Sequence, residues 1–274
     1  RRGRGRLPPM SAWLATAAFG AACCGGPPVN PGLLGPGEHG AVTAGALGLW
    51  TPLRWSSDGG VHGSSGGRAT ASVGARLRLA PWAQVGLVVP ASLDTLRGPG
   101  LDDPVLSGRI EPRAGEMNEW VPTVSGSLAT PLGRRLPDLP PWWHGTLGAG
   151  LERTGHAHGL TAYGSVTAPF GAAGDPSVVP GWDWELGAGG GPRGDWGAVS
   201  VGGAVRGVTR GRIDGEAAGM AAVEPVLRGA FTWPVKPGVR LVASGEAGPP
   251  IPYLGRSADA DLVVGATMLL VPGA

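Results

Sequence analysis

The stretch "ASVGARLRLAPWAQVGLVVPASL", residues 71–93, decides how this chain is predicted to fold. Apolar side chains at Val73, Leu77 and Leu79 alternate with other positions, and two of those positions hold Arg76 and Arg78. An alternation with a period of two is typical of a β-strand whose two faces meet different surroundings. Residues 80–82 leave room only for a tight reversal before the next apolar run. We therefore predict two antiparallel strands joined by a short turn.

The same alternation recurs along the rest of the chain, between turns rich in Gly, Pro and Asp. Many of the segments reach about ten residues, whereas strands of globular proteins usually have about five or six. Strands of about ten residues are what a tilted, membrane-spanning barrel strand needs. We predict about twelve strands, at residues 39–50, 68–80, 82–92, 104–112, 119–130, 143–154, 157–170, 181–190, 195–207, 218–233, 238–247 and 259–271.

The connections between these strands alternate between short and long. Residues 80–82 and 154–158 permit only tight turns, whereas "RGPGLDD", "PLGRRLPDLPP" and "GDPSVVPG" are longer and rich in turn residues. Short turns at one rim and longer loops at the other are typical of up-and-down barrels. The predicted fold class is therefore all-β, a closed up-and-down antiparallel transmembrane β-barrel of about twelve strands.

Composition excludes several other classes of protein. Only 15% of residues are charged, against about 25% in an ordinary soluble domain. The net charge is +2 and the tryptophans are not interleaved with basic residues, so we expect no nucleic-acid partner. Two adjacent cysteines, Cys23 and Cys24, are the only ones, so no disulfide is expected to hold the fold.

Residues 1–24 read as an export signal, with four arginines followed by a short apolar run and small residues. The alternative is a spurious in-frame extension before Met10. "GAAC" before Cys23 resembles a bacterial lipoprotein processing site, which makes Cys23 a candidate for lipidation, although Gly20 stands where such sites usually carry Leu. Ordinary cleavage nearby is therefore the expected outcome. Residues 25–38 are predicted to be a flexible linker and residues 39–274 the barrel domain.

Tryptophans fall at or near the ends of the predicted strands. An amphipathic ring there would lie at a membrane–water boundary. Aromatic residues also flank the strands of soluble β proteins, which is the alternative interpretation. The predicted aromatic girdle consists of Trp50, Trp82, Trp120, Trp142, Trp143, Trp182, Trp184, Trp196 and Trp233.

The export signal, long strands such as "ARLRLAPWAQVGLVVP" and "HGLTAYGSVTAPF", and the tryptophan-rich strand ends together resemble a bacterial outer-membrane β-barrel. The resemblance covers residues 39–271 and is one of architecture. It implies a location in the outer membrane of a Gram-negative cell. The implied partners are outer-membrane lipids, the barrel-assembly machinery during biogenesis, and an unknown small solute.

The charged residues of the strands are then expected to face the lumen, because an arginine facing lipid at the bilayer midplane costs about 2–4 kcal/mol. Both signs are present, so we expect Arg–carboxylate pairs across the lumen. In a soluble barrel or sandwich the faces would be exchanged, with the leucines filling a core. The lumen-facing candidates are Arg76, Arg78, Arg109, Glu111, Glu152, Asp183, Glu185, Arg206, Glu224, Arg228, Arg240, Glu246, Asp259 and Asp261.

Short motifs give no convincing catalytic or metal site. "GSSGG" at 63–67 matches a nucleophile motif around Ser65, but the context predicts a Ser/Gly loop and not a strand followed by a helix. "HAH" at 156–158 reads as a solvated turn, and "LDD" at 101–103 as ordinary turn chemistry. "GAGGGPRG" at 187–194 lacks the third glycine of a dinucleotide fingerprint and is predicted to be a turn.

We therefore predict no cofactor, no metal and no enzymatic activity. The expected function is a pore or transporter that passes or binds small solutes through a polar lumen. Three alternatives stay open. They are a purely structural closed barrel, a soluble exported β-barrel that binds an apolar ligand, and a barrel enzyme that hydrolyses lipids.

Overall fold

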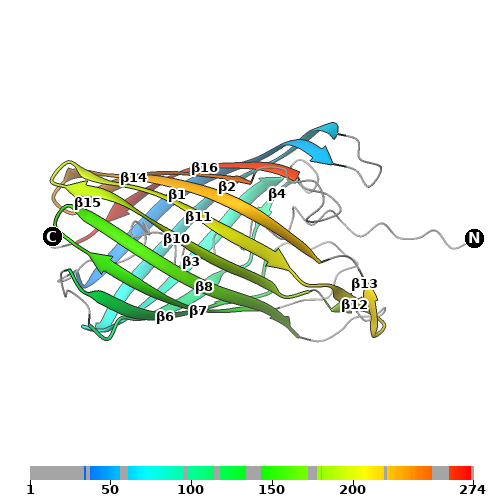
Figure 1. Ribbon diagram of the computed structural model, residues 1–274, viewed down its shortest axis with the longest axis horizontal. Helices are drawn as coiled ribbons and strands as arrows, with labels where there is room; N and C mark the ends of the chain where they lie inside the picture. The colour runs from blue at the N-terminus through cyan, green and yellow to red at the C-terminus, as the bar shows by residue number, and fades with distance from the viewer. Residues whose placement is uncertain are drawn as a thin grey trace, which may run out of the picture.

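The fold is a barrel of long, oblique strands, seen in a computed structural model of the protein (Figure 1). The structure describes residues 34, 38–55, 61–94, 98–113, 118–133, 143–171, 178–179, 181–218, 221–248 and 259–272. Within these residues, no helix could serve as a membrane span. The strands are β1 (Gly40–Trp55), β2 (Val61–Ala80), β3 (Ala83–Asp94), β4 (Gly98–Leu101), β5 (Val105–Ile110), β6 (Trp120–Ala129), β7 (Trp143–Thr154), β8 (His158–Phe170), β9 (Val178–Val179), β10 (Asp183–Gly194), β11 (Gly197–Val208), β12 (Gly211–Ile213), β13 (Glu216–Ala218), β14 (Ala222–Lys236), β15 (Val239–Gly248) and β16 (Asp259–Leu270).

Twelve wall strands close into a ring, which confirms the predicted architecture. Each strand pairs antiparallel with the next wall strand along the chain, and β1 pairs with both β2 and β16 to complete the ring. The short strands β4 and β5 both pair with β3 and form one wall strand that is interrupted at residues 102–104. All twelve predicted segments correspond to a wall strand.

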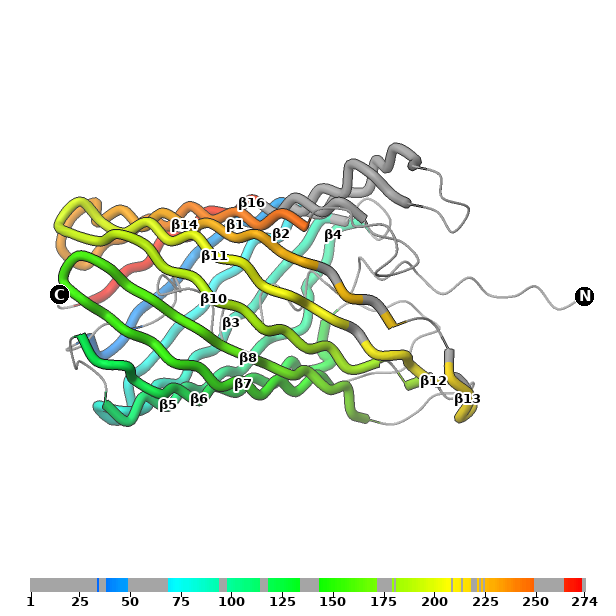
Figure 2. Tube along the Cα trace, viewed as in Figure 1, coloured from blue at the N-terminus to red at the C-terminus, as the bar shows by residue number. Residues whose placement is uncertain are grey.

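The two ends of the barrel differ, as the connection lengths predict. At one end, turns at residues 81–82, 155–157, 195–196 and 237–238 are short, and β1 begins and β16 ends there; we call this end the short-turn rim. The opposite end is the long-loop rim. A small separate sheet formed by β9, β12 and β13 extends from it, which the sequence analysis does not predict. Figure 2 shows β12 and β13 projecting beyond the wall strands at that end.

Two glycine-rich segments are strands where the sequence analysis predicts a loop and a turn. Residues 63–67 belong to β2 and pair with β1, so the predicted Ser/Gly loop is wrong. Residues 187–194 belong to β10, so the predicted strand at 181–190 continues to Gly194 and the turn predicted at 187–194 is wrong. The turn follows at Asp195 and Trp196. Gly187 faces the Tyr163 ring, and a Cβ there would lie 2.6 Å from the Tyr163 Oη. Glycine in this strand therefore serves close packing and not chain reversal.

The wall has an apolar outer face and a polar inner face. Outward side chains are exposed along the strands, with Leu147 at 74% and Val201 at 65% exposed. Alternate residues turn inward, where Ser107 is 4% and Arg109 is 2% exposed. Because successive residues of a strand point to opposite faces, the period of two in the sequence sorts the two kinds of side chain onto the two faces.

Candidate functional site

The candidate site is the inner wall, which is rich in hydroxyl groups between β5 and β8. Register places Ser107 beside Ser127, Ser127 beside Thr146, and Thr146 beside Thr167. The two threonine hydroxyls lie 2.9 Å apart. These side chains form one row across four strands, because inward residues in register lie next to each other around the wall. The row offers donors and acceptors of hydrogen bonds without charge.

Four charged side chains on neighbouring strands form a closed set of ion pairs, which we call the Arg–Glu quartet. It consists of Glu185 on β10, Arg206 on β11, Arg228 on β14 and Glu246 on β15. Arg206 lies 3.1 Å from Glu185 and 2.8 Å from Glu246. Arg228 lies 2.5 Å from Glu185 and 2.7 Å from Glu246. Each arginine thus contacts both glutamates, and the quartet carries no net charge.

Tyr163 on β8 extends the quartet by one strand. Its hydroxyl donates to Glu185 Oε1 at 2.7 Å and accepts a hydrogen bond from Arg228. Arg228 also donates to Glu185 from Nη2 at 2.7 Å, so both oxygens of this carboxylate are engaged. Bidentate pairs of this kind fix geometry as well as charge. Side chains from five successive wall strands, β8 to β15, are therefore held together on the inner wall.

A second group of charged side chains lies near the short-turn rim. It consists of Arg109, Glu111 and Glu152, and we call it the rim trio. Arg109 on β5 donates to Glu111 at 2.5 Å and to Glu152 on β7 at 2.6 Å, which links two strands across β6. Gln84 on β3 donates from Nε2 to Glu111 at 3.2 Å. The trio carries one excess negative charge.

The other lumen-facing candidates divide into described and undescribed side chains. Arg76 is buried, and Arg78 and Asp183 are half-buried at inward positions of their strands. Arg240 pairs with Glu38, which precedes β1. Glu224, Asp259 and Asp261 lie in β14 and β16, but their side chains are outside the described set.

Most of the predicted girdle lies at the two rims. Trp82, Trp120, Trp196 and Trp233 are exposed near the short-turn rim, and Trp143 and Trp182 near the long-loop rim. Trp143 stacks on Phe170 with ring centroids 6.3 Å apart, and Trp196 stacks on Phe231 at 6.4 Å. Trp184 is half-buried against Gly207. The side chain of Trp50, and all of Trp142 and Cys23, lie outside the described residues.

The motifs that suggested chemistry do not assemble into a reactive site among the described residues. His156 and His158 are exposed at the turn between β7 and β8. Asp102 accepts a hydrogen bond from Ser92 and Asp103 one from the Gly133 backbone, so both carboxylates fasten the interrupted wall strand. In the part of the chain that the structure describes, no group of three or more His, Cys, Asp or Glu is placed to hold a metal.

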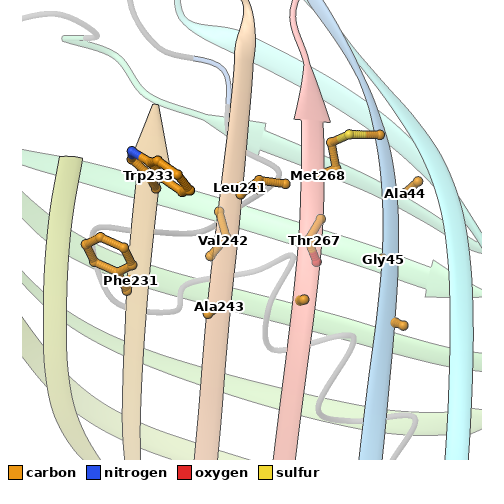
Figure 3. A pocket seen from close by; sticks show the side chains of 11 residues that line it. Ala44, Gly45, Phe231, Trp233, Leu241, Val242, Ala243, Thr267 and Met268 are labelled. Atoms are coloured by element: carbon orange, nitrogen blue, oxygen red, sulfur yellow. The ribbon is translucent and has the colours of Figure 1, made fainter. Parts of the chain in front are cut away.

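The outer face carries a shallow depression across β14, β15, β16 and β1 (Figure 3). Its floor is made of small side chains, because Ala46, Ala266 and Ala243 pair in one row of the sheet. Phe231, Trp233, Leu241 and Met268 stand around it. This lining is almost wholly apolar, as expected of a surface that meets acyl chains.

No protein-family model matches the chain, and no curated protein resembles it in sequence. Among solved structures, it is similar to an outer-membrane channel from Pseudomonas putida F1, with a TM-score of 0.71 and 14% identity over 89% of this chain and 98% of that one. The chain has the fold of a bacterial outer-membrane β-barrel. The translocator domain of the autotransporter NalP from Neisseria meningitidis is more distant, with a TM-score of 0.51 and 13% identity over 95% of each chain.

Some residues that organise the inner wall of this outer-membrane barrel are absent from the predicted set, among them Tyr163, Gln84 and Leu34. Tyr163 joins the quartet, and Gln84 joins the rim trio to Leu34, a residue that the sequence assigns to a linker. Tyr163 and Gln84 each alternate with outward apolar residues, as the predicted arginines do, so the period of two carried a signal for them. Tyr163 and Gln84 carry no formal charge, whereas the predicted lumen-facing set contains only charged residues.

Proposed function

We propose that this protein is an outer-membrane pore for small polar solutes. The observation that carries the proposal is the contrast between the two faces of one closed wall, apolar outside and polar inside. A polar solute loses part of its hydration when it enters a channel, and polar groups on the inner wall can replace the lost water contacts. An apolar outer band is what lipid requires of a barrel. Lipids of the outer membrane would then cover the outer face.

The charges support a pore with little preference for the sign of its solute. Among the described residues, charged groups of both signs line the inner wall towards its short-turn rim. Most are engaged with one another, as in the quartet and the rim trio, so little net field is left for a passing ion. The uncharged hydroxyl row supports solutes that form hydrogen bonds. These charged groups include Arg76, Arg78, Arg109, Arg206, Arg228, Arg240, Glu38, Glu111, Glu152, Asp183, Glu185 and Glu246.

A closed structural barrel is the second candidate, and one observation favours it. Small inward side chains such as Ser107 and Ser200 are almost fully buried, with 4% and 0% exposure. Inward groups of a wide, water-filled channel would be more exposed. Conductance separates the two candidates, because only a pore carries current.

The test begins with the full chain expressed in a Gram-negative host. Outer membranes are isolated, and boiled and unboiled samples are compared on a detergent gel. The proposal predicts a fast-migrating unboiled band in the membrane fraction, and step-like currents from the purified protein in planar bilayers. A folded barrel that carries no current would overturn the pore and leave the structural barrel.

Two adjacent residues of β7, whose side chains point to opposite faces of the wall, provide a matched pair of variants. Thr146 points inward and Leu147 outward on β7. Thr146→Trp adds bulk to the inner wall and is expected to lower the conductance. Leu147→Trp adds an aromatic ring to the lipid face of the same strand, so the conductance is expected to stay unchanged. Equal effects of the two variants would contradict a solute path along the inner wall.

A further inference from the structure

Leu34 lies six residues before β1, yet it is fixed to the inner wall near the short-turn rim. The residue is 4% exposed. Its side chain belongs to a buried apolar cluster with Ala41, Leu269 and Val271, from the beginning of β1 and the end of β16. A position predicted to be part of a flexible linker is therefore bound to the barrel.

The backbone of Leu34 is held from both sides by one side chain. Its N–H donates to Gln84 Oε1 at 3.1 Å, and its carbonyl accepts from Gln84 Nε2 at 3.2 Å. The Gln84 amide thus pairs with one residue as a neighbouring strand would, by one donor and one acceptor. Such pairing recognises an extended backbone and is independent of the bound side chain.

Two arginines strengthen the same attachment. Arg78 donates from Nη2 to the Leu34 carbonyl at 2.8 Å and from Nε to the Glu38 carbonyl at 3.2 Å. Arg240 pairs with the Glu38 carboxylate. The chain before β1 is consequently attached at two points, four residues apart, to side chains of β2, β3 and β15. We call Gln84, Arg78 and the apolar cluster around Leu34 the clasp.

We propose that the clasp is a binding site for an extended peptide backbone, occupied by Leu34 of the same chain, and that this contact narrows the barrel at the short-turn rim. A backbone bound to inward side chains takes up cross-section that a solute would use. Breaking the hydrogen bonds of Gln84 leaves the barrel wall intact, because the wall strands are joined by their own backbone ladder. The narrowing of a solute path rests on the proposed pore, whereas the clasp itself does not.

Chemical labelling tests the clasp without reference to current. Cys23 and Cys24 are changed to Ser, and a single cysteine is placed by Leu34→Cys or, as an accessible reference, by Leu132→Cys at a position that is 78% exposed. A charged maleimide is the probe. Leu34→Cys is expected to react at least about tenfold more slowly than the reference. Two hydrogen bonds of ordinary strength favour the attached state over the detached state by at least this factor, and only the detached state exposes the thiol to the probe. Equal rates would overturn the proposal.

Release of the clasp is then tested in the same background. Gln84→Ala is expected to speed labelling of Leu34→Cys by about tenfold, whereas Thr146→Val, an inner-wall change that does not touch Leu34, leaves the rate unchanged. Each variant is first checked for the fast-migrating unboiled band, and Arg78→Met is used in place of Gln84→Ala if the latter does not fold. A folded release variant that labels no faster refutes the clasp.

Single-channel recordings of the same proteins test the narrowing. Gln84→Ala is expected to raise the conductance by at least about twofold, because the constriction would be removed. A conducting protein whose conductance is unchanged by release of the clasp overturns the narrowing. If no protein conducts, the pore is refuted, and the labelling rates still decide whether the clasp exists.

Discussion

Replacing Arg228 with methionine is the sharpest test of how the inner wall is held together. Arg228 contacts Glu185 through two nitrogens at 2.5 and 2.7 Å, Glu246 at 2.7 Å, and the Tyr163 hydroxyl. Its side chain is 11% exposed, and those of Glu185 and Glu246 are 6% and 16% exposed. Removing the guanidinium therefore leaves two carboxylates in a poorly solvated place with one arginine between them.

The expected loss of stability in Arg228→Met follows from the excess of one negative charge in the quartet. Removing one partner of a buried ion pair costs about 3–5 kcal/mol, because the remaining charge is left uncompensated. Arg206 still lies beside both glutamates, at 3.1 and 2.8 Å. We therefore expect Arg228→Met to lower the free energy of unfolding by about 3 kcal/mol, the lower end of that range.

The assay is equilibrium unfolding by urea of the barrel in lipid vesicles, followed by tryptophan fluorescence. Arg153→Met is the matched control, because Arg153 is an exposed arginine that donates a hydrogen bond to the Asn118 carbonyl at 3.0 Å. An exposed substitution of this kind is expected to change stability by less than about 0.5 kcal/mol.

A double variant distinguishes charge imbalance from simple loss of packing. Arg228→Met combined with Glu246→Met leaves Glu185 with Arg206, so the charges balance again. The double variant should be more stable than Arg228→Met alone by at least about 1 kcal/mol. Two outcomes would refute the role given to the quartet. One is that the losses of unfolding free energy from the two substitutions simply add, and the other is that Arg228→Met is as stable as the Arg153→Met control.

Three further predictions concern the two faces and the pore. Leu147→Arg, on the outer face of β7, should cost about 2–4 kcal/mol in vesicles, whereas Leu132→Arg outside the wall should cost little in the same urea titration. Gly207→Ala should displace the Trp184 ring, which overlaps the place of a Cβ there, and shift tryptophan fluorescence; Gly203→Ala, whose Cβ would have 3.7 Å to its nearest neighbour, should not. Reversal potentials in a salt gradient should give a potassium-to-chloride permeability ratio within about twofold of one, and strong selectivity would contradict the balanced inner wall.

The strand architecture could be predicted from the sequence because one repeating pattern encodes it. Residues 143–154 were predicted to be a strand, and β7 has these bounds. The alternation of arginine with leucine at residues 76–79 reflects two faces that meet different surroundings, so it identifies strands wherever it occurs. A run of small residues carries no such alternation. The glycine-rich run of β10 therefore predicts a turn, although Gly187 in it makes room for the Tyr163 ring.

Which charges meet could not be predicted in the same way. The ion pairs of the Arg–Glu quartet join residues between 18 and 43 positions apart, and they depend on the register of four strands and on side-chain direction. The attachment of Leu34 is harder still to predict, because Gln84 contacts a backbone N–H and a backbone carbonyl, which every residue except proline possesses. No residue type marks such a segment, so composition alone assigned it to a linker.

The closed meander has a consequence for the order of its strands. Every wall strand has two hydrogen-bonded neighbours, and only the pair of β1 and β16 lacks a covalent connection between its members. Since β1 begins and β16 ends at the same rim, a short linker could join them and a new start be cut at another turn of that rim, such as Pro81 and Trp82. The pairing of strands in the closed ring therefore does not depend on which strand comes first in the chain. We expect circular permutants to fold to the same ring.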